Sequence, residues 1–120
     1  IEVCDDFSDK KAENLTKKLL YNPVKITALV TFNDIIAVAS YRAAKEMKKK
    51  IGEELSIVGF DDDRVAAYIT PALTTVWQPS YAKGERAAEI LLSALEQGTL
   101  PKAREELACV LIFRDSCCEV

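Results

Sequence analysis

Short apolar runs alternate along the chain with longer segments in which apolar residues recur every three to four positions. The short runs are rich in β-branched residues and predict strands, whereas the longer segments predict helices that cover a sheet. Several short runs are apolar at every position, as expected for parallel strands buried on both faces. The predicted fold class is therefore α/β, a parallel sheet flanked by helices. Strands are expected at residues 1–4, 26–32, 55–60, 73–77 and 107–113.

Helices are predicted between these strands. The first is capped by Ser8 and stops at Asn22-Pro23, because the residue before a proline disfavours helical backbone. The second starts at Asn33-Asp34 and ends in the lysine run 48–50, where positive charge complements the helix dipole. We interpret that run as a helix-end charge rather than a phosphate patch. A helical turn is expected at residues 64–69 and a long helix at 80–96, closed by Gly98.

The composition agrees with one domain, or a piece of one. The 120 residues are 49% hydrophobic and 29% charged, which is enough apolar material for a single core. With 16 Lys and Arg against 19 Asp and Glu, the chain offers no broad basic surface for nucleic acid. It contains no histidine, which removes His-based acid–base catalysis, Ser-His-Asp and Cys-His nucleophiles, and zinc sites that need an imidazole.

The four cysteines show no C-x-x-C spacing, and Cys117 and Cys118 are adjacent, which is a poor geometry for a disulfide framework or a thiolate metal site. With Cys4 and Cys109, they are interpreted as reduced thiols, which favours a reducing cytoplasm. No run approaches the roughly 18 apolar residues of a membrane span. The acidic residues near the start do not suit a signal peptide. We expect no membrane association.

Polar side chains follow the predicted strands at their carboxyl ends, where open parallel sheets bind ligands. They are Asp5 and Asp6, Asn33 and Asp34, the run 61–63, and Trp77 with Gln78. Carboxylates and amides beside a tryptophan can hydrogen-bond the hydroxyls of a small polar ligand while the indole covers its apolar face. That combination suits a sugar or nucleoside pocket. Taken singly, each residue is explained equally well as a helix cap, a solvated turn or a core position.

Two enzymatic interpretations use the same acids. Asp5-Asp6 after the first strand suggests a phosphoacceptor receiver domain, but the last strand runs into Arg114-Asp115-Ser116 and lacks the lysine that such a domain needs. Residues 61–65 match the D-x-D-x-V pattern of phosphohydrolases with an aspartate nucleophile. That pattern is short and lies in the middle of the chain, whereas it would lie near the start in that family. Both interpretations remain remote alternatives.

Five motifs in a fixed order carry a resemblance to a known family. They read ALVTFND at 28–34, LSIVGFDD at 55–62, TPALTTVWQP at 70–79, GERAAEILLSAL at 84–95 and FRDS at 113–116. From about Phe7 to Ser116 the chain resembles the LacI/GalR family. The resemblance implies the C-terminal part of a type I periplasmic-binding-protein-like domain, in which two α/β subdomains close over a small effector.

The resemblance also implies a domain organisation. Residues 1–120 would form the C-terminal part of the effector-binding domain. The family's DNA-reading helix-turn-helix, hinge helix and first subdomain would precede Ile1. The helix at 80–98 resembles a segment that packs on the absent N-terminal subdomain, so its apolar stripe would be exposed in this chain.

Effector-binding residues follow from the same resemblance. Asn33 and Asp61 match positions that bind effector hydroxyls or amides, and Gln78 matches a position near the cleft. Trp77 is a fourth candidate, although it departs from the commoner basic or polar residue there. Three further residues match positions that fix the loop, namely Asp34, Asp62 and Thr75. A sugar or sugar phosphate is the expected effector, and a purine is the next candidate.

The resemblance further implies a two-fold homodimer built from the helix at 34–48 and the segment 66–71. The expected patch consists of Ala39, Ala43, Ala67, Tyr68 and Ile69. The alternative is that the alanines simply pack on the sheet.

The function implied is that of the effector-sensing and dimerisation domain of a DNA-binding transcriptional regulator, usually a repressor. It would act in the cytoplasm and contact operator DNA only through a head domain that this chain lacks. It would not be an enzyme, and no catalytic residue, cofactor or metal is expected. A solute-binding protein of transport or chemotaxis on the same fold is the alternative.

Overall fold

The computed structural model describes residues 9–99 and 104–118. The strand expected at residues 1–4, the Ser8 cap and the Asp5-Asp6 pair lie outside the described residues. The chain forms two compact units, one comprising Ile1–Trp77 and Leu111–Val120 and the other comprising Gln78–Val110. Each unit is described by itself below.

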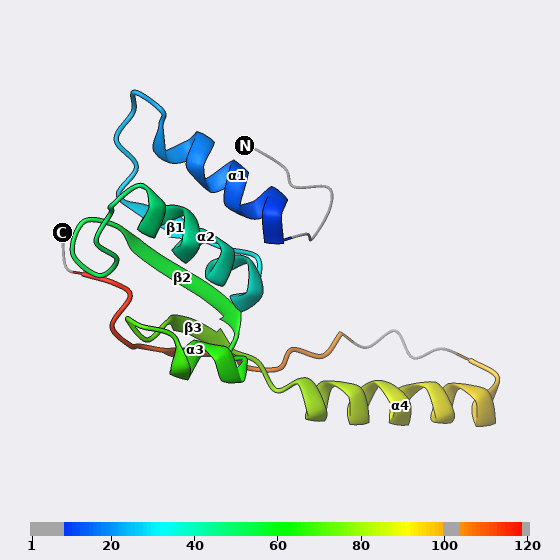
Figure 1. Cartoon of the computed structure of the whole chain (residues 1–120). Coiled ribbons are helices and arrows are strands. Elements are labelled where there is room, and N and C mark those ends of the chain that lie inside the picture. The colour runs from blue at the N-terminus through cyan, green and yellow to red at the C-terminus, as the bar shows by residue number, and fades with distance from the viewer. Residues whose placement is uncertain (1–8, 100–103, 119–120) are drawn as a thin grey trace. The chain divides into compact units, whose positions relative to one another are not determined.

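The first unit is built on a parallel sheet, as the apolar runs predict (Figure 1). The strand order is β1-β2-β3-β4, the same as the order in the chain. β1 pairs in parallel with β2, and β2 pairs in parallel with β3. The bounds are β1 Ala28–Val30, β2 Ser56–Asp61, β3 Thr74–Trp77 and β4 Val110–Ile112. The predicted α/β class and parallel sheet are thereby confirmed.

Helices pack in layers on this sheet. α2 (Asp34–Glu46) packs on β2, and α1 (Asp9–Leu20) packs in turn on α2 (Figure 1). The short helix α3 (Arg64–Tyr68) follows β2 and also contacts α2. Apolar side chains from α2, the sheet and α3 form the core, and they are Ala37, Tyr41, Ala44, Leu55, Ile57, Ala66 and Leu73.

Burial differs between the central and the outer strands. Half of the residues of β2 and of β3 are buried, but β1 and β4 contain no buried residue, and Val30 in β1 has 83% of its surface accessible. β1 covers three residues rather than the predicted 26–32. The expectation of strands buried on both faces is therefore wrong for β1 and β4. The physical reason is that β1 and β4 are the two end strands of the described sheet, so each has a neighbouring strand on one side only.

The second helix ends earlier than the sequence predicts. α2 stops at Glu46, and Lys48 adopts a left-handed backbone with φ 55°. The turn is closed by the Lys49 amide, which donates to the carbonyl of Ala44 at 2.9 Å. This is the hydrogen-bond pattern of a helix C-cap, for which glycine is the usual left-handed residue. The lysine run 48–50 therefore lies beyond the helix instead of forming its last turn.

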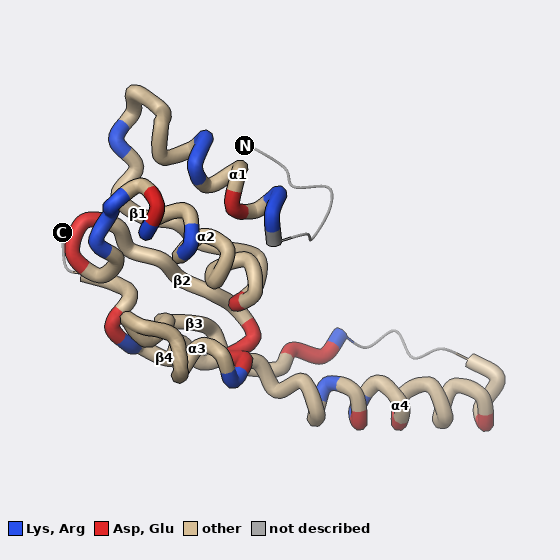
Figure 2. The backbone as a smooth tube through the Cα atoms, in the orientation of Figure 1, with Lys and Arg blue, Asp and Glu red and all other residues tan. Residues whose placement is uncertain are grey.

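Charge is distributed unevenly over the first unit. Figure 2 shows aspartates at the N-terminal end of α2 and at the end of β2, and basic residues at the opposite end of α2. The acidic end is the carboxyl edge of the sheet, at which ligands bind in open parallel sheets.

The second unit consists of α4 (Ser80–Gln97) and the described residues that follow it. Gly98 ends α4 with φ 68°, as predicted. Arg86 donates to the carboxylates of Glu89 at 2.7 Å and Glu105 at 2.6 Å, which ties the helix to the following segment. No residue of α4 is buried, and its large apolar side chains Tyr81, Leu91, Leu92 and Leu95 are exposed. Among the described helices, none is long and apolar enough to cross a membrane.

Candidate functional site

Asp34 joins three elements at the carboxyl edge of the sheet. Its carboxylate is fully buried at the first position of α2. One oxygen, Oδ1, accepts a hydrogen bond from the Thr75 hydroxyl at 2.6 Å, and the other, Oδ2, accepts from the Asp63 amide at 2.7 Å. These bonds connect α2, the loop after β2, and β3. The predicted loop-fixing roles of Asp34 and Thr75 agree with this geometry.

The surroundings of Asp34 are tightly packed. Desolvation by burial raises the pKa of its carboxyl above the ordinary value, and the hydrogen bonds from Thr75 and Asp63 act in the opposite direction. Gly59 in β2 faces this carboxylate so closely that a methyl group there would collide with Oδ1 of Asp34. The same methyl group would lie 2.9 Å from Leu73 Cδ2. Glycine is therefore required at residue 59 by close approach.

Asn33 caps α2 next to the buried carboxylate. Its backbone is extended, and its side-chain Oδ1 accepts a hydrogen bond from the Ile36 amide at 2.9 Å. The sequence left open whether Asn33 is a helix cap, and the structure shows that it is. The cap uses only the side-chain oxygen, so the amide nitrogen of this half-buried residue can still donate to a ligand.

Asp61 and Trp77 lie side by side at the same edge. They are register partners in the pairing of β2 with β3, and parallel partners point to the same face of a sheet. Asp61 is half-buried with φ 105°, and Trp77 is 42% exposed. Gln78 follows Trp77 directly but is the first residue of the second unit, so the structure does not place its side chain with the others. Effector binding by all four residues stays a prediction.

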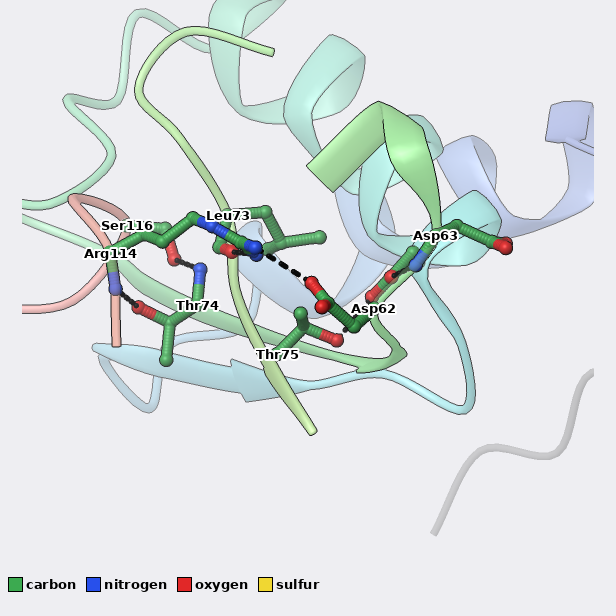
Figure 3. A network of polar contacts seen from close by, with 8 residues as sticks. Asp62, Asp63, Leu73, Thr74, Thr75, Arg114 and Ser116 are labelled. Carbon is green, nitrogen blue, oxygen red and sulfur yellow. Dashed lines mark hydrogen bonds and ion pairs between the residues drawn. The ribbon is translucent and has the colours of Figure 1, made fainter. Parts of the chain in front are cut away.

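Arg114 fixes the loop that follows Asp61 at the end of β2. Its guanidinium donates to the carboxylate of Asp62 at 2.7 Å and to the carbonyl of Leu73 at 2.9 Å (Figure 3). Asp62 has a left-handed backbone with φ 55°, so this ion pair holds a residue in a conformation of higher energy. The loop-fixing prediction for Asp62 agrees with this contact. Sequence reasoning found the R-x-S ending but did not assign this role to its arginine.

Ser116 completes the connection between the strands. Its hydroxyl accepts from the Thr74 amide at 2.8 Å and donates to the Ile57 carbonyl at 2.6 Å. The Ile57 amide in turn donates to the Ser116 carbonyl at 2.9 Å. The serine of the R-x-S ending thus hydrogen-bonds both β2 and β3. Its side chain is fully buried.

The expected dimer patch is only partly exposed. Tyr68 is 78% exposed, Ala67 is exposed and Ile69 is half-buried. Ala39 and Ala43 have no accessible surface within the chain. Including these two alanines in a surface patch was therefore wrong, because both are buried inside the unit.

No metal or redox centre stands out in the described part of the chain. Cys109, Cys117 and Cys118 are free thiols, and Cys4 lies outside the described residues. Across residues 9–99 and 104–118, no three His, Cys, Asp or Glu side chains come together as a possible metal site.

Comparison with known proteins places the fold in a family. A profile of the periplasmic binding protein-like domain matches residues 3–117. The chain is 33% identical over 115 residues to the ribose operon repressor of Escherichia coli (strain K12), covering 96% of this chain and 35% of that protein. It therefore spans about a third of the length of that relative.

Solved structures of transcriptional regulators also resemble this chain. A LacI family transcriptional regulator from Enterococcus faecium with bound ribose superposes with a TM-score of 0.81 at 30% identity, covering 96% of this chain and 42% of that one. The lac repressor dimer bound to operator and the anti-inducer ONPF gives a TM-score of 0.84 at 29% identity, with coverage of 95% and 40%. These similar proteins are transcriptional regulators rather than enzymes.

The fold and the matched profile define the class of protein, a periplasmic-binding-protein-like α/β domain. More particularly, the chain belongs to the LacI/GalR family and corresponds to part of its effector-binding domain.

Proposed function

We propose that the chain is the effector-sensing part of a transcriptional repressor that acts in the cytoplasm. The observation that supports this most directly is the edge of the sheet where Asn33, Asp61 and Trp77 are carried by elements that Asp34 ties together. The site contains a carboxylate, an amide donor and a partly exposed indole. That set hydrogen-bonds hydroxyl groups and covers an apolar ring face without covalent chemistry.

The effector that we propose is a small sugar, and ribose is the first candidate. Both the Escherichia coli relative, by its name, and the Enterococcus faecium regulator, by its bound ligand, are connected with ribose. A sugar phosphate or a purine is the next candidate. In the native protein, the exposed apolar side of α4 would pack on the other half of the effector-binding domain, and Gln78 would complete the pocket. Ligand binding would shift operator affinity through the coupling between the two sites.

Asp61→Asn is expected to weaken ribose binding by about 1 to 3 kcal/mol, because a hydroxyl would lose its carboxylate acceptor. The matched control is Asp63→Asn, which removes the same charge two residues later, where the side chain makes no cap hydrogen bond. Trp77 is the one tryptophan in the chain and pairs with Asp61, so its fluorescence during a ribose titration of the native protein reports binding. Equal losses in the two variants would contradict a direct role for Asp61.

Asn33 allows its two roles to be separated by substitution. Asn33→Asp keeps an oxygen that can accept from the Ile36 amide but removes the donor offered to the ligand. We expect it to weaken ribose binding by about 1 to 3 kcal/mol with stability preserved. Asn33→Ala should lower both the affinity for ribose and the stability of the protein. The stability loss expected in urea unfolding is about 1 kcal/mol. Ribose affinity unchanged in Asn33→Asp would mean that the residue acts only as a helix cap.

We also propose that the native protein is a homodimer that uses Ala67, Tyr68 and Ile69. Tyr68→Glu should convert dimers to monomers in sedimentation equilibrium at micromolar concentration, because it places a charge in an apolar contact. Tyr21→Glu is the matched control, since Tyr21 is 79% exposed and lies outside the patch. A monomeric wild type, or a Tyr68→Glu variant that stays dimeric, would contradict this interface.

A further inference from the structure

Two consecutive residues with an unusual backbone lie at the end of β2. Asp61 has φ 105° and Asp62 has φ 55°, whereas residues other than glycine seldom adopt a positive φ. Such conformations raise the energy of the loop and persist only where the surrounding contacts hold them. Asp61 is the candidate hydrogen-bond acceptor for the effector. The contacts that hold this backbone therefore also set the direction of the Asp61 carboxylate.

The second of these residues is held by Arg114. Its guanidinium donates from Nη2 to Oδ1 of Asp62 at 2.7 Å and from Nη1 to the carbonyl oxygen of Leu73 at 2.9 Å (Figure 3). Because a guanidinium is planar, two bonds in different directions fix its orientation as well as its position. The side chains of Arg114 and Asp62 are 20% and 21% exposed, so solvent ions screen this pair less than they screen a surface pair.

The backbone that carries Arg114 is itself anchored to β3 and to the residues before it. The Arg114 amide donates to Thr74 Oγ1 at 3.0 Å, and the Asp115 amide donates to the Ala72 carbonyl at 3.0 Å. The Ser116 hydroxyl accepts from the Thr74 amide at 2.8 Å. The guanidinium thus extends from a segment that has little freedom to move. A rigid support of this kind is what a side chain needs in order to hold a binding residue in place.

The same loop is held at its other end by Asp34, whose Oδ2 accepts from the Asp63 amide at 2.7 Å. Asp34 therefore fixes the backbone of residue 63, whereas Arg114 fixes the side chain of Asp62. Without Arg114, Asp62 would be released to relax toward a negative φ. Because residue 63 would stay in place, this rotation would move the Asp61 side of the loop. The Asp61 carboxylate would then point away from its present direction.

We propose that Arg114 is a positioning residue for effector binding, because through Asp62 it holds the Asp61 carboxylate in the direction from which it accepts a hydroxyl of the effector. This inference rests on the effector site proposed above. Arg114 acts without touching the effector. When a loop samples other conformations, the apparent affinity falls by the fraction of molecules that keep the competent one. Loss of Arg114 is therefore expected to lower ligand affinity as well as stability.

The test compares ribose affinity with stability in variants of the native protein. Arg114→Ala should weaken ribose binding about tenfold, because a residue in the left-handed region is no longer held. Arg114→Lys keeps the charge but replaces the planar fork by one ammonium group, so its ribose affinity should lie between those of the wild type and Arg114→Ala.

Ser116→Ala is the matched control. It removes the hydrogen bonds that the same segment makes to the Thr74 amide and the Ile57 carbonyl, so it should lower the urea midpoint. It leaves the contact with Asp62 in place and should therefore change ribose affinity less than about twofold.

A rescue variant tests whether Arg114 acts through the backbone of residue 62. Glycine adopts a positive φ about as readily as a negative one. Asp62→Gly added to Arg114→Ala should therefore restore part of the ribose affinity that Arg114→Ala loses. A purely structural ion pair predicts the opposite, since the double variant lacks both of its partners.

Hydrogen exchange without ligand separates this inference from the proposed effector. Amides of residues 61–63 should exchange faster in Arg114→Ala than in the wild type and at an unchanged rate in Ser116→Ala. A wild type that does not bind ribose would contradict the proposed effector, and the exchange rates would still decide whether Arg114 holds the loop. The positioning role is overturned if Arg114→Ala leaves exchange in this loop unchanged. It is also overturned if a wild type that binds ribose loses no more affinity through Arg114→Ala than through Ser116→Ala.

Discussion

Replacing Asp34 by alanine is expected to destabilise the protein by about 3 kcal/mol. The change leaves the Thr75 hydroxyl and the Asp63 amide without their acceptor, and each buried polar group that loses its partner costs about 1 to 3 kcal/mol. Relief of the desolvated charge offsets part of this loss. The free energy of unfolding from urea denaturation measures the effect.

Asparagine at the same position is the informative control. Its oxygen can accept from the Asp63 amide, and its nitrogen can donate to the Thr75 hydroxyl, which is able to accept as well as to donate. We therefore expect Asp34→Asn to cost about 1 kcal/mol or less. Equal destabilisation by alanine and asparagine would mean that the negative charge itself, and not the hydrogen-bond pattern, holds these elements together.

The comparison with asparagine also gives a pH dependence for Asp34. Because burial raises the pKa of this carboxyl above the ordinary value of 3.8, the folded state keeps its proton to higher pH than the unfolded state does. Between those two pKa values the folded state binds more protons, so stability falls as pH rises. The wild type should therefore lose stability relative to Asp34→Asn as pH increases above 3.8, and the difference should become constant above the raised pKa. A wild type that gains stability relative to Asp34→Asn as the pH rises would contradict a raised pKa.

The order of the elements could be predicted because it depends on local periodicity. The apolar run of β2 and the Asn33 cap of α2 are signals within a few residues of each other. The end of α2 could not be predicted, because it depends on Lys48 adopting a backbone that its residue type disfavours. The sequence pattern placed the helix end in the lysine run 48–50 instead, beyond Glu46, which is the last residue of α2.

Burial was harder to predict than element type. β1 carries apolar residues typical of a buried element, yet it is exposed in the chain, and the exposure of α4 was expected only from the family resemblance. Whether an element is buried depends on which other elements pack against it. A local sequence pattern carries no information about those neighbours. The same limit applies to Ala39 and Ala43, whose small apolar side chains suit both a dimer contact and an interior helix face.

The positions of the candidate site residues could be predicted, but not the contacts that fix them. Asp61 and Trp77 are the last residues of β2 and β3, and Asn33 lies shortly after β1, so a sequence pattern that locates strand ends also locates these residues. Arg114 reaches Asp62 across 52 positions of the chain, and such a contact leaves no periodic signal. The partner of each polar group is therefore visible only in the folded arrangement.

Replacing Gly59 by alanine is expected to destabilise the protein by about 4 kcal/mol, the largest effect that we predict for a single methyl group. The added Cβ would collide with Oδ1 of Asp34 and crowd the buried side chain of Leu73. Overpacking of this kind costs about 1 to 3 kcal/mol. Asp34 can retreat only by giving up its hydrogen bond to Thr75, which adds a further cost of about 1 to 3 kcal/mol.

Gly84 supplies a matched control for the same chemical change. A Cβ at Gly84 would have no atom within 4 Å, and the residue lies inside α4. Gly84→Ala should therefore leave stability unchanged or raise it by about 0.5 to 1 kcal/mol, as helix propensity favours alanine. The clash itself is isolated by the Asp34→Ala/Gly59→Ala double variant. Since Asp34→Ala removes the atom that the new methyl group meets, the double variant should lose at least about 1 kcal/mol less than the sum of the single losses. Strict additivity in urea unfolding would show that the cost at Gly59 arises elsewhere than at this carboxylate.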